Sequence, residues 1–189
     1  MDYTFVRTTR EYDEYGNISY QRFYDAEGQM ILSKEGYAAV ERSYIAKGRM
    51  VGEKYFDTEE KLLLLAAGYA EKKMELDPET GWTLKESYFG LDGEPIMLSG
   101  GYAAFGREYN EKGWIVKEKY FGTDGEPIML AKGYAGYFRE PDENNNTAVQ
   151  IYLGIKDERV MITDGYCEIR RKWHENKKEI GRASCRERV

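Results

Sequence analysis

Residues able to do acid–base or nucleophilic chemistry are sparse in this sequence of 189 residues. His174 is the single histidine and stands in a charged stretch, Arg170–Glu175, which is typical of a solvated surface. Cys167 has no second histidine that could act as its base. Nothing in the sequence matches a Ser-His-Asp set, a phosphate-binding glycine loop or a paired-cysteine metal site. We therefore predict that this chain has no catalytic residues and no cofactor.

Acidic residues are abundant but follow a repeated pattern. The turns Asp92–Glu94 and Asp124–Glu126 lack the alternating oxygen ligands of a calcium loop, and turn chemistry explains their Asp-Gly pairs. Glu53, Glu86 and Glu118 recur at one position of the pattern, whereas a glycosidase needs two carboxylates in dissimilar surroundings. We expect these three glutamates to be exposed strand residues, and we expect no metal site.

Recurrent aromatic residues are the strongest candidates for binding. Trp82 and Trp114 share a position directly after a predicted turn, and Tyr88 and Tyr120 belong to an aromatic pair that recurs along the chain. Two interpretations remain open: the rings stack within a sheet, or they form platforms for sugar rings beside Glu and Asn side chains. Ligand binding is predicted at these four residues, and exposed tryptophans would favour the sugar platform.

Composition and charge argue against several classes of protein. Hydrophobic residues make up 41% and charged residues 33%, yet 17 Tyr, 7 Phe and 3 Trp are too many for a disordered coil. Tyrosine together with 20 glycines favours strands and tight turns. The net charge of −6 argues against nucleic acid as a partner. The longest apolar run, Leu62–Ala67, is too short to span a bilayer, so we expect no membrane insertion.

The last residues depart from the rest of the chain. Residues 180–189 resemble the translation of a common short-read sequencing adapter, so we exclude 179–189 from fold prediction. Cys185 falls in this segment, which leaves Cys167 alone and predicts no intrachain disulfide. The natural protein is expected to continue past Lys178, as part of a longer polypeptide.

A tandem repeat dominates the chain. The dipeptide Gly-Tyr recurs at spacings of 32, 33, 32 and 32 residues. Its five glycines are Gly36, Gly68, Gly101, Gly133 and Gly165. The stretch Gly90–Leu98 returns almost unchanged as Gly122–Leu130. Residues 1–178 are therefore predicted to form one tandem-repeat region of about five units, with a partial unit at the N-terminus.

Each repeat divides into strands and turns. One unit is predicted to contain two strands, two turns and a short apolar piece, at Tyr102–Tyr109, Trp114–Phe121, Asn110–Gly113, Thr123–Glu126 and Pro127–Leu130 respectively. No stretch has helical periodicity of useful length. The predicted fold is therefore all-β, with tandem hairpins stacked into an elongated or curved antiparallel sheet. Aromatic rings are expected to stack on their counterparts in the next repeat, and an open sheet, a spiral and a wide barrel remain alternatives.

A recurring Tyr-Asp or Tyr-Asn followed by Gly, as in Tyr12–Gly16, Tyr24–Gly28 and Tyr109–Gly113, resembles bacterial YD repeats of the RHS type. It is also similar to variant MORN repeats and, more loosely, to the aromatic-glycine repeats that bind bacterial cell walls. The double unit of 32 residues and the Gly-Tyr-Ala motif depart from all three, so no ligand residue is carried over. The resemblance implies a cell-surface or secreted setting, or an appendage of an envelope-polysaccharide enzyme.

Three functions follow from these patterns. The first is a non-catalytic binding module for an envelope glycan or a protein partner, in which several weak sites add to useful avidity. The second is a structural spacer or shell of a larger surface protein. The third is an accessory segment of an enzyme whose catalytic domain lies elsewhere in a longer polypeptide. Buried rather than exposed tryptophans would favour the spacer over the binding module.

Overall fold

The computed structural model describes residues 7–45, 48–173 and, for the main chain alone, 179–185. These residues form twelve β-strands and no helix, which confirms the all-β prediction. The chain divides into two compact units, residues 1–99 and 100–189. The described part contains no helix that could cross a membrane.

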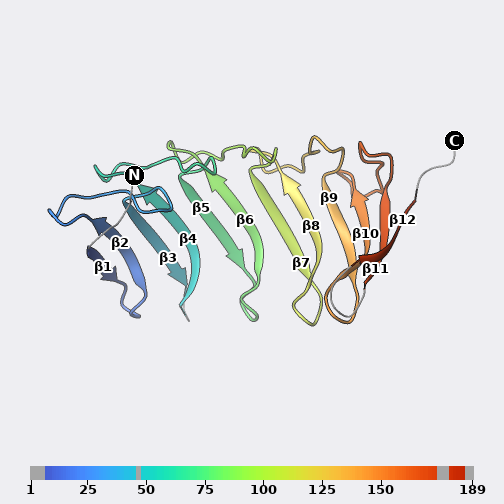
Figure 1. Ribbon diagram of the computed structural model, residues 1–189, viewed down its shortest axis with the longest axis horizontal. Coiled ribbons are helices and arrows are strands. Elements are labelled where there is room, and N and C mark those ends of the chain that lie inside the picture. Colours follow the sequence, from blue (N-terminus) through green and yellow to red (C-terminus); the bar gives the residue numbers. More distant parts are fainter. Residues whose placement is uncertain (1–6, 46–47, 174–178, 186–189) are drawn as a thin grey trace. The chain divides into compact units, whose positions relative to one another are not determined.

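Each unit is an antiparallel meander in which every strand pairs with the next one along the chain (Figure 1). The strands of the first unit are β1 (Arg7–Tyr12), β2 (Ile18–Tyr24), β3 (Ala39–Ile45), β4 (Arg49–Phe56), β5 (Glu71–Leu76) and β6 (Thr83–Phe89). Those of the second are β7 (Ala104–Tyr109), β8 (Ile115–Phe121), β9 (Gly136–Pro141), β10 (Thr147–Leu153), β11 (Glu168–Trp173) and β12 (Glu179–Cys185). Because the strand order is linear in each unit, neither meander closes on itself.

A residue in the left-handed region closes each turn at a regular interval. Positive φ angles follow one another along the chain in steps of 12, 8 and 12 residues, with one step of 13 at the longer turn Asp77–Gly81. One repeat has its three turns end at Gly113, Gly125 and Gly133, with φ of 76°, 79° and 84°. Each of these glycines donates its N–H to the carbonyl oxygen three residues earlier. Glycine at these places fixes where the chain reverses, because an L side chain there costs about 1–2 kcal/mol.

The third turn of each repeat was not predicted from the sequence. The predicted strand Tyr102–Tyr109 starts directly after Gly101, whereas Gly101 closes a turn with φ 84° and the strand begins at Ala104. The short apolar piece before this turn forms a single bridge, Phe89↔Pro95, with the end of β6. Each repeat is therefore one long hairpin followed by a compact loop with two turns.

Pairing is longer within hairpins than between them. The two strands of a hairpin share six or seven paired positions, as in β3–β4 and β7–β8. Successive hairpins share three, as in β4–β5 and β8–β9. Successive hairpins therefore diverge toward the turns within each hairpin. In the second unit these are the turns that join β7 to β8 and β9 to β10.

Where successive hairpins diverge, side chains donate hydrogen bonds to main-chain carbonyl oxygens of the preceding hairpin. The Tyr44 hydroxyl donates to the carbonyl oxygen of Ile18 at 3.1 Å, and Trp173 Nε1 donates to that of Thr147 at 2.8 Å. Arg139 donates in the same way to the carbonyl oxygen of Ile115. Each donor reaches back 24 to 26 residues, so consecutive hairpins are tied together where the ladder ends.

An aromatic ladder runs along one face of each meander. In the first unit, ring centroids lie 5.9, 5.1, 6.0 and 5.0 Å apart along Phe23, Tyr37, Tyr55, Tyr69 and Tyr88. In the second unit, centroids lie 5.1, 6.1, 5.0 and 6.0 Å apart along Tyr102, Tyr120, Tyr134, Tyr152 and Tyr166. The expected stacking of rings is thus present, but the tyrosine of each Gly-Tyr turn stands between the rings of successive strands. These tilted and edge contacts stabilise the repeat beyond their buried area.

Small residues fill the space beneath the loops. The alanines after Gly-Tyr are almost fully buried, namely Ala38, Ala70, Ala103 and Ala135. Their N–H groups donate to the last residue of the second strand of the same hairpin, as Ala103 does to Phe121 at 2.8 Å. Cys167 occupies the same repeat position and is half-buried directly before β11. A small side chain at this position is required by the close approach of backbone to backbone.

β12 falls within the segment that sequence analysis excluded. Its main chain pairs antiparallel with β11, from Glu168↔Cys185 to Trp173↔Glu179, and it lies 32 residues after β10. Main-chain pairing does not depend on side-chain identity, so this strand does not bear on the origin of residues 179–189. Residues 186–189, and His174 with its neighbours to Lys178, lie outside the described residues.

Candidate ligand-binding site

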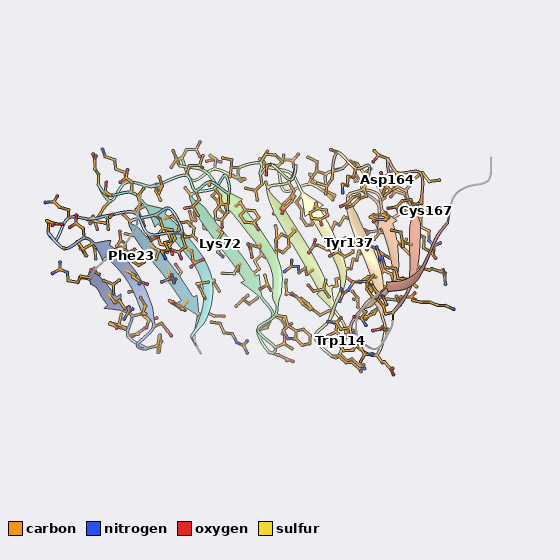
Figure 2. The ribbon with its side chains drawn as sticks, in the orientation of Figure 1. Phe23, Lys72, Trp114, Tyr137, Asp164 and Cys167 are labelled. Carbon is orange, nitrogen blue, oxygen red and sulfur yellow. The ribbon has the colours of Figure 1, made fainter. Side chains whose placement is uncertain are left out.

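Trp114 follows the turn between β7 and β8 and is held there by its own backbone. Its N–H donates to Asn110 Oδ1, and its carbonyl oxygen accepts from the Asn110 N–H, both at 3.0 Å. The side chain is half-buried at the turn end of the hairpin (Figure 2). These two hydrogen bonds therefore fix the backbone of Trp114, and part of its side chain remains accessible.

A hollow of about 620 Å³ opens beside Trp114. The residues that line it come from two successive hairpin turns and include Tyr109, Asn110, Glu111, Lys112, Trp114, Pro141, Asp142 and Glu143. It exists because β8 and β9 pair over three positions and then separate. Residues of both turns, 110–112 and 142–143, thus line one hollow together with the aromatic residues Tyr109 and Trp114.

The polar groups around the hollow are both basic and acidic. Lys112 Nζ lies 4.7 Å from the centroid of the Trp114 ring, which is a cation–π contact. The Asn146 side-chain amide donates to Asp142 at 2.9 Å and holds the pKa of that carboxyl below its usual range. Asp142 is therefore ionised and accepts hydrogen bonds within its own turn, whereas Glu111 and Glu143 are exposed. Aromatic rings and exposed carboxylates lining one hollow can take a flat, hydroxyl-rich ligand.

Trp82 has a similar local setting in the first unit. Its N–H donates to Thr80 Oγ1 at 3.3 Å, and its carbonyl oxygen accepts from the Asp77 N–H at 2.8 Å. The side chain is half-buried. It does not line the hollow beside Trp114.

Tyr88 and Tyr120, the other predicted ligand residues, are members of the aromatic ladder. Their hydroxyl groups donate to Glu86 at 2.7 Å and to Glu118 at 2.6 Å. Burial raises the pKa of Tyr120, and the hydrogen bond to Glu118 raises it further. Neither tyrosine lines the hollow, so Trp114 alone of the four predicted residues does.

One residue of the first unit at the repeat position of Trp114 and Trp82 has a different role. Arg49 stands there and donates to the carbonyl oxygens of Asp77, Pro78 and Glu79 in the next hairpin turn, at 3.5, 3.4 and 3.3 Å. Arginine at this position therefore binds the neighbouring turn, whereas Trp114 stands beside a hollow.

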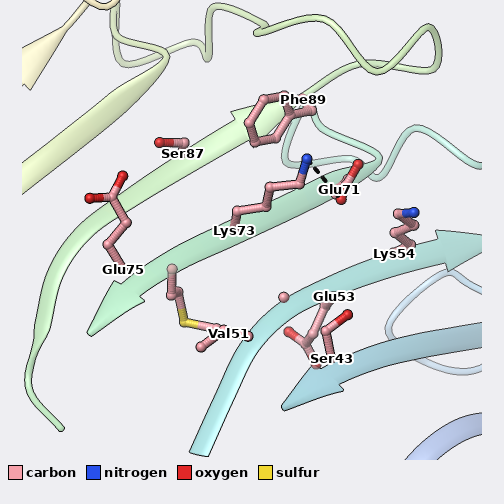
Figure 3. Close-up of a pocket in the computed structure, with 11 residues that line it drawn as sticks. Ser43, Val51, Glu53, Lys54, Glu71, Lys73, Glu75, Ser87 and Phe89 are labelled. Carbon is pink, nitrogen blue, oxygen red and sulfur yellow. Dashed lines mark ion pairs between the residues drawn. The ribbon is translucent and has the colours of Figure 1, made fainter. Parts of the chain in front are cut away.

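A second hollow of about 430 Å³ lies over β3–β6 (Figure 3). Its space comes from the missing side chain of Gly52 and the short side chains of Ser43 and Ser87. Lys73 Nζ lies 3.4 Å from Glu71 Oε1 and 4.4 Å from the centroid of the Phe89 ring. The lysine of this hollow therefore contacts the ring and pairs with the glutamate.

The prediction that the repeated glutamates are exposed was wrong: Glu86 is half-buried, and Glu53 and Glu118 are more deeply buried. Their side chains retain 12% and 10% of their accessible surface and pair with Arg42 at 3.0 Å and Arg107 at 2.8 Å. Burial alone would raise the pKa of Glu53, but hydrogen bonds from Lys72, Tyr55 and Arg42 lower it. These carboxylates are members of cross-strand ion-pair ladders.

Several residues of the hollow were missed at the level of sequence, notably Tyr109, Lys112 and Glu143. A signal for them was present, since the turns at Asn110 and Asp142 lie 32 residues apart and so face each other in a meander. Within residues 7–45 and 48–173, no group of three or more His, Cys, Asp or Glu side chains is placed to hold a metal ion.

No protein-family profile matches the chain, and no curated protein matches it at a significant level.

Proposed function

We propose that this chain is a non-catalytic repeat binding module and that the hollow beside Trp114 binds a glycan. The observation that supports this proposal is the pairing of a half-buried indole with exposed carboxylates in a space of about 620 Å³. Sugar rings present C–H groups on one face, which pack on an aromatic ring, and hydroxyl groups at the edge, which donate to carboxylates.

The charge around the hollow narrows the class of glycan. Among the described residues that line the hollow, Glu111, Asp142 and Glu143 are acidic and only Lys112 is basic, with its ammonium group already facing the Trp114 ring. Anionic polysaccharides would be repelled by this rim, and the chain as a whole carries a net charge of −6. A neutral or amino-sugar glycan is therefore the expected ligand. Weak sites in successive repeats would add to useful avidity.

The test is titration of the folded full chain with neutral, amino-sugar and anionic polysaccharides, followed by tryptophan fluorescence and calorimetry. Trp114→Phe keeps a flat ring and Trp114→Ala removes it, with far-UV circular dichroism checking that both variants fold. We expect a saturable signal with neutral or amino-sugar glycans, and at least a tenfold rise in Kd for Trp114→Ala, which is about 1.4 kcal/mol. Trp114→Phe should raise the Kd less than Trp114→Ala does. Absence of binding to the whole panel, or unchanged binding by Trp114→Ala, would refute the proposal.

A second candidate function is a structural spacer or shell segment of a larger surface protein. The observation that favours it is Arg49, which uses the repeat position of Trp114 to bind the next hairpin turn. If Trp114 only separates two turns, Trp114→Ala will lower the free energy of unfolding while no glycan binds. The resemblance to YD repeats fits this function, and the role of accessory repeats in an envelope-polysaccharide enzyme stays a third proposal.

A further inference from the structure

Two tripeptides in the chain have the pattern Asn-X-Ser/Thr that accepts N-linked glycans. They are Asn17-Ile18-Ser19, after the turn between β1 and β2, and Asn145-Asn146-Thr147, at the turn between β9 and β10. The sequence alone does not rank them. The structure does, because the two acceptor amides have different surroundings.

The side-chain amide of Asn17 is already engaged. Its Nδ2 donates to Asp13 Oδ2 at 2.8 Å, and its N–H donates to Asp13 Oδ1 at the same distance. Its Oδ1 lies against the next hairpin turn, 2.9 Å from the point where a Cβ on Gly48 would stand. To react, Asn17 Nδ2 would have to leave a carboxylate, and a charge-assisted hydrogen bond of this kind lowers the reactive population about tenfold or more.

Asn145 stands in the opposite situation. It is exposed at the left-handed position of its turn, with φ 61°. Arg139 donates to Asn145 Oδ1 at 2.6 Å and to Thr147 Oγ1 at 3.3 Å, so one guanidinium holds the two functional groups of the tripeptide together. The arginine engages the amide oxygen of Asn145, whereas the reacting atom is the amide nitrogen.

We propose that Asn145 is an acceptor of N-linked glycosylation in the folded protein and that Asn17 is not. In the reaction, Asn145 Nδ2 attacks the anomeric carbon of an oligosaccharide carried on a polyprenyl diphosphate. The N–C bond forms, the bond from that carbon to the diphosphate oxygen breaks, and the amide proton passes to a base of the transferring enzyme. The lipid diphosphate leaves. This inference does not depend on the proposed function.

The test is incubation of the folded full chain with a lipid-linked oligosaccharide and a purified oligosaccharyltransferase that requires only Asn-X-Ser/Thr. Intact mass and peptide mapping give the number and place of glycans. We expect one glycan, on Asn145, with occupancy at least about ten times that of Asn17. Asn145→Gln and Thr147→Ala should each abolish the modification, and Asn17→Gln should leave it unchanged.

Two synthetic peptides, residues 12–20 and 140–149, separate local sequence from fold. We expect both peptides to be modified at comparable rates, since neither retains the contacts of the folded chain. Modification of Asn17 in the folded chain to the same extent as Asn145 would overturn the proposal. So would a folded chain that takes no glycan, whether or not the peptide with Asn145 is modified.

Discussion

Replacing Gly125 by alanine tests whether the left-handed positions set the stability of this fold. Gly125 has φ 79°, and a Cβ added to it would meet no atom within 4 Å. The substitution therefore adds backbone strain without a clash. The expected loss in the free energy of unfolding is about 1–2 kcal/mol, the cost of an L residue in the left-handed region.

Asp157 holds the position of Gly125 one repeat later, and substitutions there measure the same backbone strain in a second way. It is held at φ 63° and pairs with Lys117 at 3.3 Å and Lys119 at 3.1 Å. Asp157→Ala and Asp157→Gly both remove these exposed ion pairs, each worth about 0–1 kcal/mol. The difference between the two variants therefore isolates the strain, and the glycine variant should be more stable than the alanine variant by about 1–2 kcal/mol.

Urea unfolding followed by far-UV circular dichroism and fluorescence measures these changes, with Gly52→Ala as the control. Gly52 lies in β4 outside the left-handed region, and its nearest neighbour to an added Cβ is the carbonyl oxygen of Lys72 at 3.5 Å. Alanine there should be neutral or stabilise by about 0.4–1 kcal/mol, because it restricts the unfolded chain. The reasoning fails if Gly125→Ala costs no more than Gly52→Ala, or if Asp157→Gly is no more stable than Asp157→Ala.

Two further predictions concern the ladders. Burial raises the pKa of Tyr137 and Tyr152 to about 12, above an unfolded value of about 10. The contribution that each neutral tyrosine makes to the free energy of unfolding is therefore complete below pH 10 and is lost as the pH rises from 10 to 12. Each tyrosine should cost about 1.4 kcal/mol per pH unit in that window, and tyrosinate absorbance appearing near pH 10 with an unchanged urea midpoint would contradict this. A double-mutant cycle on Arg107 and Glu118, using Arg107→Met and Glu118→Gln, should give a coupling energy of about 1–3 kcal/mol, because the pair is largely buried. The exposed pair Lys61–Glu59 should give less than about 0.5 kcal/mol, and equal coupling in the two pairs would show that burial is irrelevant.

Much of the fold could be predicted from the sequence because its information is local. Gly-Tyr at a constant spacing, turn residues before each glycine and the absence of helical periodicity predicted the hairpins of the repeat, and strands such as β7 and β8 lie within two residues of the predicted ranges. The inserted residue at Asp77–Gly81 was accommodated in a turn, as expected for a hairpin. The turn closed by Gly101 was missed, because a glycine before an aromatic residue also fits the start of a strand.

The candidate site shows what the sequence did not decide. Four aromatic residues were predicted to bind ligand from their recurrence, yet recurrence is equally produced by stacking, and Tyr88 and Tyr120 lie in the ladder. Trp114 instead lines the hollow that opens where β8 and β9 separate, between two hairpin turns.

By itself the sequence determined the repeat, the strand class and two of the three turns in each repeat, since each depends on residues close together along the chain. Tertiary structure decided which side chains meet across hairpins. It buried Glu118 against Arg107, although a strand glutamate by itself predicts exposure. It also separated Asn17, bonded to Asp13, from the exposed Asn145. The physical reason is that burial and pairing depend on register between strands, and register in a meander is fixed by turns and by contacts many residues apart.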